Sequence, residues 1–478
     1  MAESLKQQTA KGFLWSGIER FSIQGLRFIL GLVLARLLLP ADYGLIGMLT
    51  IFLAISQTFI DSGFTRALIQ KKDRDETDYS TAFFFNIGVG IFFYLLLFIG
   101  APYIAKFYDT PELTRLTRFI GINVFINSLA IVQRAKFTIN VDFKTQSKAS
   151  ISAVLIGGFV GIAMAYKGYG VWSLVTQSLL RNGLQTIFLW ILSKWKPQLV
   201  FSKASFRQLF SFGSKLLIAS LLETIYRNIY LIIIGKLFSA QDLGYYTRAK
   251  QFQQFPSENI TGIINRVTFP VLSSIQDEEE KLVNAYKKFI KLATFIIFPL
   301  MIGMAAVAEP MIRLVLTEKW IQTVPLLQLL CFAGMLYPVH AINLGIINVK
   351  GRSDIFLKLE IIKKIITTVI ILVTFSFGIK AMVIGQIAIS FLSLFINTYY
   401  SKRFVDYGLL AQLKDMFPTL LISLFMASIV FFLTNLMSSD ALKLIVGISG
   451  GAVIYFLSAR ILNFSEIKEL RSLINNMH

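Results

Sequence analysis

The chain is poor in the residues that build disulfide bonds and metal sites. Its 478 residues include one cysteine, Cys331, and two histidines, His340 and His478. A single cysteine excludes an intramolecular disulfide, and two histidines without a Cys/His cluster exclude a multi-histidine metal centre. We therefore expect neither a metal nor a cofactor.

Charged residues are also scarce. They make up 15% of the chain, against 55% hydrophobic residues, and the mean hydropathy is +0.65. Because soluble domains contain about 25% charged residues, this composition indicates a membrane protein. The net charge of +20 could suggest nucleic acid as a partner. However, the basic residues lie in short loops between apolar runs, as membrane topology requires, so we expect no nucleic-acid binding.

A common sequence pattern of nucleotide-hydrolysing enzymes is missing. The chain has no G-x-x-x-x-G-K-[ST] phosphate loop. We therefore expect no enzymatic activity. The polar start, Met1–Lys11, lacks the cleavage pattern of a secretory signal, so we expect the first span to be a retained signal anchor.

Long apolar runs fill the rest of the chain. A bilayer span needs about 20 mostly apolar residues. That length predicts an all-α polytopic membrane protein with about fourteen spans, at residues 13–37, 44–69, 80–104, 113–132, 150–166, 171–193, 210–236, 243–270, 288–308, 321–347, 359–377, 380–400, 415–436 and 442–462. The span at 243–270 is the most polar, which suits a helix that lines a cavity.

The loops between these spans alternate in charge. One side receives 28 basic residues and the other receives six. Because basic loops stay in the cytoplasm, both termini are predicted to be cytoplasmic, in a multi-pass protein of the bacterial cytoplasmic (inner) membrane.

An internal repeat relates the two halves. Arg27 precedes Asp42 by 15 residues, and Arg227 precedes Asp242 by 15 residues. Gly44 and Gly244 follow at the same spacing, as do Arg66 and Arg266. Further along, Lys148 and Gly168 match Lys358 and Gly378 at a larger offset. Such a repeat predicts two pseudo-symmetric lobes of six helices, at residues 1–200 and 201–405, followed by two additional helices and a short cytoplasmic tail at 406–478.

Charged side chains inside the spans are the candidate functional residues. A charge in the hydrocarbon costs roughly 2.5 kcal/mol or more on insertion scales, so it usually faces a cavity or a partner. An arginine fork bonds phosphate oxygens in pairs and stays charged. The cations that we expect to bind an anionic substrate are Arg20, Arg27, Arg66, Arg227, Arg248 and Arg266. The acids that could couple ions or compensate charge are Glu19, Asp61, Glu223 and Glu258.

Structural explanations compete with this one. Glu223 and Arg227 stand at i, i+4, and Asp61 lies near Arg66, so either could be a pair that only lets charges enter the membrane. Arg66 and Arg266 lie near helix ends, where they could snorkel to the interface. Arg36 and Lys236 are expected to be interfacial anchors.

Several short segments resemble a known family. They are Leu34–Gly44, Asp61–Phe64, Ala67–Gln70, Gly168–Trp172, Gly235–Phe238, Leu243–Lys250, Arg266–Leu272 and Val349–Asp354. Together these segments resemble the bacterial Wzx-like oligosaccharide flippases. That branch includes lipopolysaccharide biosynthesis proteins and teichuronic acid exporters, within the superfamily that also holds the MATE drug exporters. The resemblance covers the first twelve spans.

The resemblance implies a MATE-like fold and a flippase that works by alternating access. Its substrate would be an undecaprenyl-diphosphate-linked oligosaccharide for lipopolysaccharide, exopolysaccharide or capsule synthesis. Membrane lipid, and possible polysaccharide polymerase and chain-length proteins, would be its partners. Two rival functions remain open at this point. One is a cation-coupled multidrug exporter of the same fold, and the other is a membrane polymerase or ligase of lipid-linked sugars.

Overall fold

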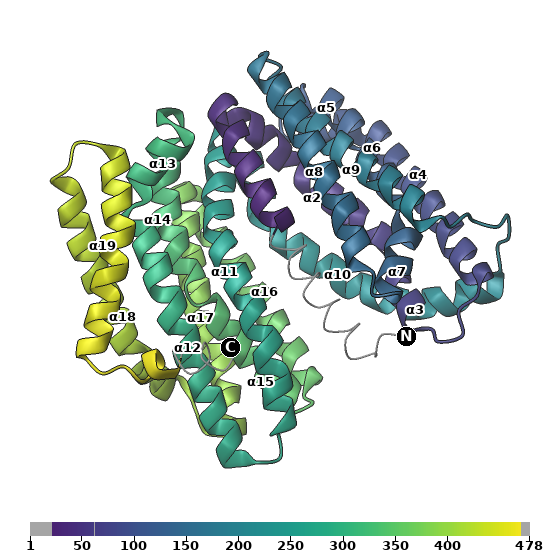
Figure 1. The fold of residues 1–478 in the computed structure, drawn as a ribbon. Coiled ribbons are helices and arrows are strands. Elements are labelled where there is room, and N and C mark those ends of the chain that lie inside the picture. Colours follow the sequence, from purple (N-terminus) through teal and green to yellow (C-terminus); the bar gives the residue numbers. More distant parts are fainter. Residues whose placement is uncertain (1–21, 62, 470–478) are drawn as a thin grey trace, which may run out of the picture. The chain divides into compact units, whose positions relative to one another are not determined.

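The computed structural model describes residues 22–61 and 63–469, and all secondary structure in this part of the chain is helical (Figure 1). The helices form two compact units, Met1–Gly244 (unit 1) and Tyr245–His478 (unit 2). An all-helical membrane protein is therefore confirmed. The lobe division at residue 200 stays a prediction about the repeat, because the units are defined by packing and not by sequence symmetry.

The described part of unit 1 begins with a helical segment at residues 22–37 and continues to the first turn of α11. Helices α8 and α9 pack along each other, α6 packs on both α4 and α9, and α10 packs on α2, α3 and α4. The bounds are α2 Pro40–Asp61, α3 Phe64–Gln70, α4 Glu76–Phe107, α5 Leu113–Ile120, α6 Ile122–Ser128, α7 Ile131–Ile139, α8 Phe143–Tyr166, α9 Val171–Ser193 and α10 Lys203–Leu237.

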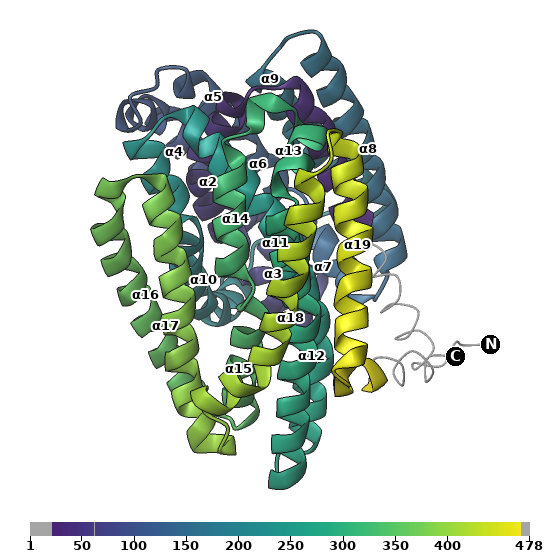
Figure 2. The ribbon, with the colours of Figure 1, turned by 90° about the vertical axis from the view of Figure 1, so that its left-hand side faces the viewer.

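Unit 2 holds the remaining helices, and α18 packs between α12 and α19 (Figure 2). Phe295, Met426 and Tyr455 join these three helices in one apolar core. The bounds are α11 Ala240–Ser274, α12 Glu279–Ala306, α13 Ala308–Leu316, η1 Glu318–Trp320, α14 Thr323–Gly334, α15 Tyr337–Val349, α16 Ser353–Thr374, η2 Phe375–Phe377, α17 Ile379–Val405, α18 Leu409–Asn435 and α19 Asp440–Ile461.

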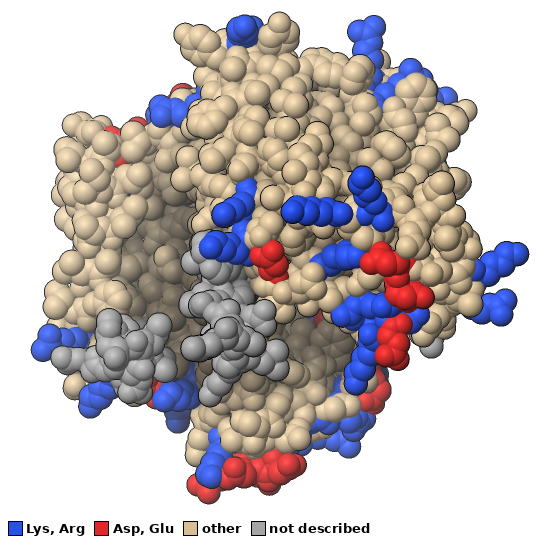
Figure 3. All heavy atoms as spheres, turned by 45° about the vertical axis from the view of Figure 1, so that its right-hand side comes forward, with Lys and Arg blue, Asp and Glu red and all other residues tan. Residues whose placement is uncertain are grey.

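Nine helices of the described part are long and apolar enough to span a membrane, or ten if the bent pair Leu113–Ser128 and Ile131–Ile139 is one span. The four remaining predicted spans also fall on helices, namely residues 22–37, α9, α11 and α16. Fourteen spans are thus compatible with the structure. On the face drawn in Figure 3, charged side chains gather in bands and leave a broad surface without them.

One predicted span is broken. Residues 113–132 form α5, α6 and the start of α7, and the chain bends by 41° before α7. The region just after residue 132, which we expected to be a loop, is therefore largely helical. This difference matters for the site, because it places Arg134 on a helix packed against α3 and α9.

The repeat-related glycines Gly44 and Gly244 sit where two helices begin and backbones meet. A Cβ on Gly44 would lie 1.6 Å from the carbonyl oxygen of Ala240, and one on Gly244 would lie 1.9 Å from that of Pro40. The first turns of α2 and α11 therefore approach each other reciprocally, at a distance that only glycine permits. Further down, α2 and α10 stay in contact through Thr58 and Thr224, whose hydroxyls are 3.0 Å apart.

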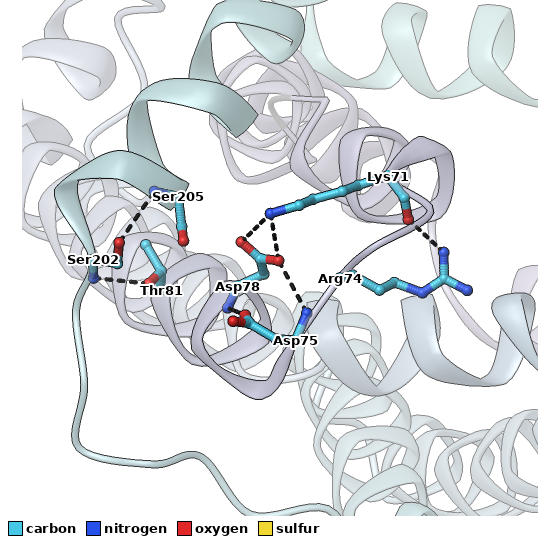
Figure 4. A network of polar contacts seen from close by, with 7 residues as sticks. All are labelled: Lys71, Arg74, Asp75, Asp78, Thr81, Ser202 and Ser205. Carbon is cyan, nitrogen blue, oxygen red and sulfur yellow. Dashed lines mark hydrogen bonds and ion pairs between the residues drawn. The ribbon is translucent and has the colours of Figure 1, made fainter.

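The linker before α10 is fixed to the start of α4 (Figure 4). The backbone NH of Ser202 donates to Thr81 Oγ1 at 3.0 Å, and Ser202 in turn caps α10 by accepting from the NH of Ser205. Beside them, Asp78 is fully buried and pairs with Lys71 at 2.6 Å. This buried ion pair holds the α3–α4 loop against α4, the helix to which the linker is also bonded.

We predict that Gly44→Ala destabilises unit 1 by about 1–3 kcal/mol, because the methyl group overlaps backbone atoms that cannot rotate away. Thermal unfolding of the purified protein measures the change. The control is Gly88→Ala, since a Cβ on Gly88 in α4 meets nothing within 4 Å. Equal melting temperatures for the two variants would contradict the close approach.

Lys71→Met should destabilise the protein by about 3–5 kcal/mol, because it leaves the buried Asp78 carboxylate without its partner. Lys72→Met is the matched control, since Lys72 is exposed. The double variant Lys71→Met/Asp78→Asn should regain part of the loss in the same unfolding measurement. A Lys71→Met variant with unchanged stability would show that the ion pair does not contribute to the stability of the fold.

Candidate functional site

Arg27 lies on the helical segment of residues 22–37, which packs against α8 and α9. Leu30 covers Gly158, and Leu34 packs in a core with Ala165. The Arg27 side chain itself remains exposed. Its predicted neighbours Glu19 and Arg20 lie outside the described residues.

Arg27 is within electrostatic range of two further arginines, Arg134 on α7 and Arg181 on α9. Both of these side chains are half-buried. None of the three arginines forms a salt bridge with a residue in the described ranges, and Arg134 Nε is buried without a hydrogen-bond partner there. Three helices of unit 1 thus bring three positive charges together.

Our sequence prediction missed Arg134 and Arg181. Arg134 was counted with a loop, because the apolar run before it was treated as a complete span. Arg181 is the one charged residue between Val171 and Ser193, so the criterion that singled out Arg27 applies to it equally. Which charges converge depends on the packing of α7 and α9, which no spacing in the sequence reveals.

Among the described residues, Asp61 is the acid that interacts electrostatically with this cluster. It lies within electrostatic range of Arg134 and Arg66 and accepts a hydrogen bond from Gln57 Nε2 at 3.0 Å. The structure therefore brings the predicted residues Asp61 and Arg66 together, although they form no ion pair within 4.0 Å in the described part of the chain. Counted over the described residues, one carboxylate stands among four arginines, an excess of positive charge.

A row of amide and hydroxyl groups lies beside the arginines. Asn127 Nδ2 donates to Gln57 Oε1 at 2.9 Å, which links α6 to α2. On the next turn of α6, Asn123 accepts from Asn182 Nδ2 at 2.8 Å and donates to Ser178 of α9 at 3.2 Å. Arg181 Nε donates to Asn182 Oδ1 at 3.4 Å. The row thus runs from Asp61 to Arg181.

The other predicted residues occupy different places. Glu223 and Arg227 are exposed on α10, and both take part in interactions. Arg248 is buried in unit 2, donates to Gln251 and stacks over Trp320 at 5.8 Å from its ring centre. Glu258 is half-buried and Arg266 is exposed, both on α11. A substrate-binding role for these residues stays a prediction.

Unit 2 contains a polar network of another kind. Asn343 Oδ1 accepts from Tyr286, Ser401 and Gln412, and its Nδ2 donates to Gln412 and to the carbonyl of Val339. These side chains are fully buried and Asn343 is saturated, so the network holds helices together. An apolar hollow of about 440 Å³ lies elsewhere in this unit, between α12, α13, α18 and α19.

Among the described residues, no group of three His, Cys, Asp or Glu side chains is placed to hold a metal ion. The chemistry that the cluster in unit 1 offers is therefore the binding of an anion by guanidinium groups. Amide and hydroxyl donors and acceptors stand next to it.

The fold is that of known transporters. It matches a structure of the lipid II flippase MurJ in an inward closed conformation with a TM-score of 0.78 and 16% identity, over 97% of this chain and 100% of that one. It also matches an inward-facing MATE family multidrug resistance transporter of the MOP superfamily with a TM-score of 0.62 and 15% identity, over 83% of this chain and 100% of that one. The MATE-like architecture expected from the sequence is confirmed.

Sequence comparison points to polysaccharide synthesis. The chain is 29% identical to the teichuronic acid biosynthesis protein TuaB of Bacillus subtilis, over 74% of this chain and 73% of TuaB. It is 28% identical to the lipopolysaccharide biosynthesis protein WzxC of Escherichia coli, over 80% of this chain and 76% of WzxC. Residues 33–325 match the family described as polysaccharide biosynthesis protein. Because this match covers more than half of the 478 residues, the chain belongs to the polysaccharide biosynthesis protein family.

Proposed function

We propose that this protein is a flippase that moves an undecaprenyl-diphosphate-linked oligosaccharide across the bacterial cytoplasmic membrane. The observation that carries the proposal is the convergence of Arg27, Arg134 and Arg181 in unit 1 without an ion pair among the described residues. The relatives TuaB and WzxC act in polysaccharide synthesis, and the fold is shared with a lipid II flippase.

Electrostatics explains why three arginines suit this substrate. Like charges in a low-dielectric region repel, so a cluster of them is stable only with water or a counter-anion at hand. A diphosphate carries several oxygens that planar guanidinium groups bind in pairs. A cation-coupled drug exporter would instead need an acidic site for cationic drugs. Among the described residues, the acid that interacts with this cluster is Asp61, through Arg134.

The proposed transport follows from where each part of the substrate is stable. The diphosphate and sugar are polar and would cross along the polar face of unit 1, while the polyprenyl tail remains in the hydrocarbon. Alternating access requires unit 1 and unit 2 to move relative to each other. The excess of basic residues in alternate loops supports cytoplasmic termini. A polysaccharide polymerase and chain-length proteins are proposed partners on the far side.

Deleting the gene should make a lipid-linked glycan accumulate in the cytoplasmic leaflet, and mass spectrometry of the lipid fraction identifies it. The double variant Arg27→Ala/Arg227→Ala should fail to restore surface polysaccharide while still inserting in the membrane. Arg36→Ala is the control on the same helix as Arg27. A normal amount of surface polysaccharide in the double variant would contradict the proposed role of these arginines.

We predict that Arg181→Gln lowers polysaccharide export at least about tenfold, because it removes one of the arginines proposed to bind the diphosphate. The variant should not be less stable than the wild type, because the substitution also removes a repulsion with Arg27. The thermal unfolding temperature should stay equal or rise by a few degrees. A variant that unfolds earlier would show instead that Arg181 supports the fold.

A further inference from the structure

We propose that the half-buried amides Gln57, Asn127 and Asn182, together with Ser178, form a glycan-recognition face beside the arginine cluster. This inference rests on the proposed function and deepens it. The arginines would hold the diphosphate that every lipid-linked glycan shares, and the amides would contact the sugar next to it.

The amides are positioned by three packed helices. Asn123 and Asn127 are four residues apart on α6 and therefore share a face. Through them, α6 bonds to Gln57 of α2 on one side and to Asn182 of α9 on the other, at 2.9 and 2.8 Å. Asn123 is buried and serves as the support. These hydrogen bonds join side chains from three helices in one row.

The row keeps unused hydrogen-bonding capacity. Each amide offers two N–H donors and two acceptor lone pairs. Gln57 accepts from Asn127 and donates to Asp61, which leaves it one donor and one acceptor position. Asn127 donates once, and its oxygen has no hydrogen bond recorded in the described structure. All three amides are partly exposed, so a ligand can reach what remains.

The network of unit 2 shows that this arrangement is not required for helix packing. There, Asn343 and Gln412 are fully buried, and every position on the Asn343 amide is occupied by protein. Amides that only join helices in a membrane gain from such saturation. The amides of unit 1 are instead half-buried and incompletely paired on spanning helices, which places them against water or a polar ligand.

Sugar is the ligand class that fits these groups. Its neutral hydroxyls both donate and accept, as the amides do. Phosphate only accepts at neutral pH, and the arginines already supply donors for it. The row runs from Asp61 to Arg181, so a sugar bound along it would have its anionic end near a guanidinium group.

The test measures binding to the full-length protein in nanodiscs of neutral phospholipid with two probes. One probe is undecaprenyl diphosphate, and the other is the lipid-linked glycan isolated from cells that lack this gene. The amide variant is Gln57→Leu/Asn182→Leu. Its control is Thr186→Val, which removes the hydrogen bond from the buried Thr186 Oγ1 to the carbonyl of Ile126. That bond also joins α9 to α6, and its loss leaves the half-buried amides intact.

We expect the wild-type protein to prefer the glycan-bearing probe by about tenfold or more, since a site built to bond hydroxyls rejects a ligand without them. The amide variant should lose this preference while its Kd for undecaprenyl diphosphate changes less than about twofold. Thr186→Val should behave as wild type. An amide variant that weakens both probes equally, or weakens neither, would overturn the inference, as would a wild-type protein without preference.

Failure of the proposed function gives different results. If no lipid-linked glycan accumulates in the deletion strain, or if wild type binds neither probe, both proposals fall. If Arg134→Ala/Arg181→Ala binds undecaprenyl diphosphate as well as wild type does, the diphosphate site is wrong. In that last case, if the amide variant loses its preference for the glycan-bearing probe, sugar recognition by the amides is still supported.

Discussion

The organisation of this protein depends on the cost of placing a charge in hydrocarbon. Arg134 and Arg181 are each repelled by Arg27, and none of the three has an ion pair in the described part of the chain. Three such groups persist on membrane helices only where water or an anion reaches them. The helix α9, which carries Arg181, is correspondingly not among the described helices that are apolar enough to span a membrane by composition alone. Polar groups thus gather around these arginines in unit 1, while α4 exposes the apolar side chains Phe92, Leu96 and Ile99.

Local packing joins the helices around these arginines. Backbone contact at Gly44 and Gly244 sets the start of α2 against the start of α11, and the Asp78–Lys71 pair fixes the loop beside the linker to α10. The amide row joins α2, α6 and α9 through side chains rather than through apolar packing. A transporter needs such rigid bodies, because alternating access moves whole groups of helices past each other and not single side chains. The polar row and the arginines belong to the same body, so a diphosphate and its first sugars would be held in one fixed register.

Sequence reasoning found the candidate site only in part. It identified Arg27 and Asp61 because each is an isolated charge in an apolar run, and the repeat drew attention to Arg227 at the equivalent place. Arg134 was missed because α7 follows a bend of 41° inside what looked like the end of a span. Arg181 was missed because no repeat partner marked it. Arg248 met the same sequence criteria as the others, yet it is buried over Trp320, which gives it a packing role that composition alone does not distinguish from substrate binding.

The sequence by itself determined the membrane class, the helical architecture and the family. These depend on hydropathy over about 20 residues and on short motifs, both of which are local properties. The repeat in the sequence also pairs Gly44 with Gly244. It matches Gly168 with Gly378, and both of these glycines adopt positive φ, at 81° and 93°. Only the tertiary structure decided which polar groups meet. Arg27, Arg134 and Arg181 are separated by more than forty residues at each step, so their convergence depends on which helix faces pack together. That choice is made by the burial of many apolar side chains at once, and no single spacing encodes it.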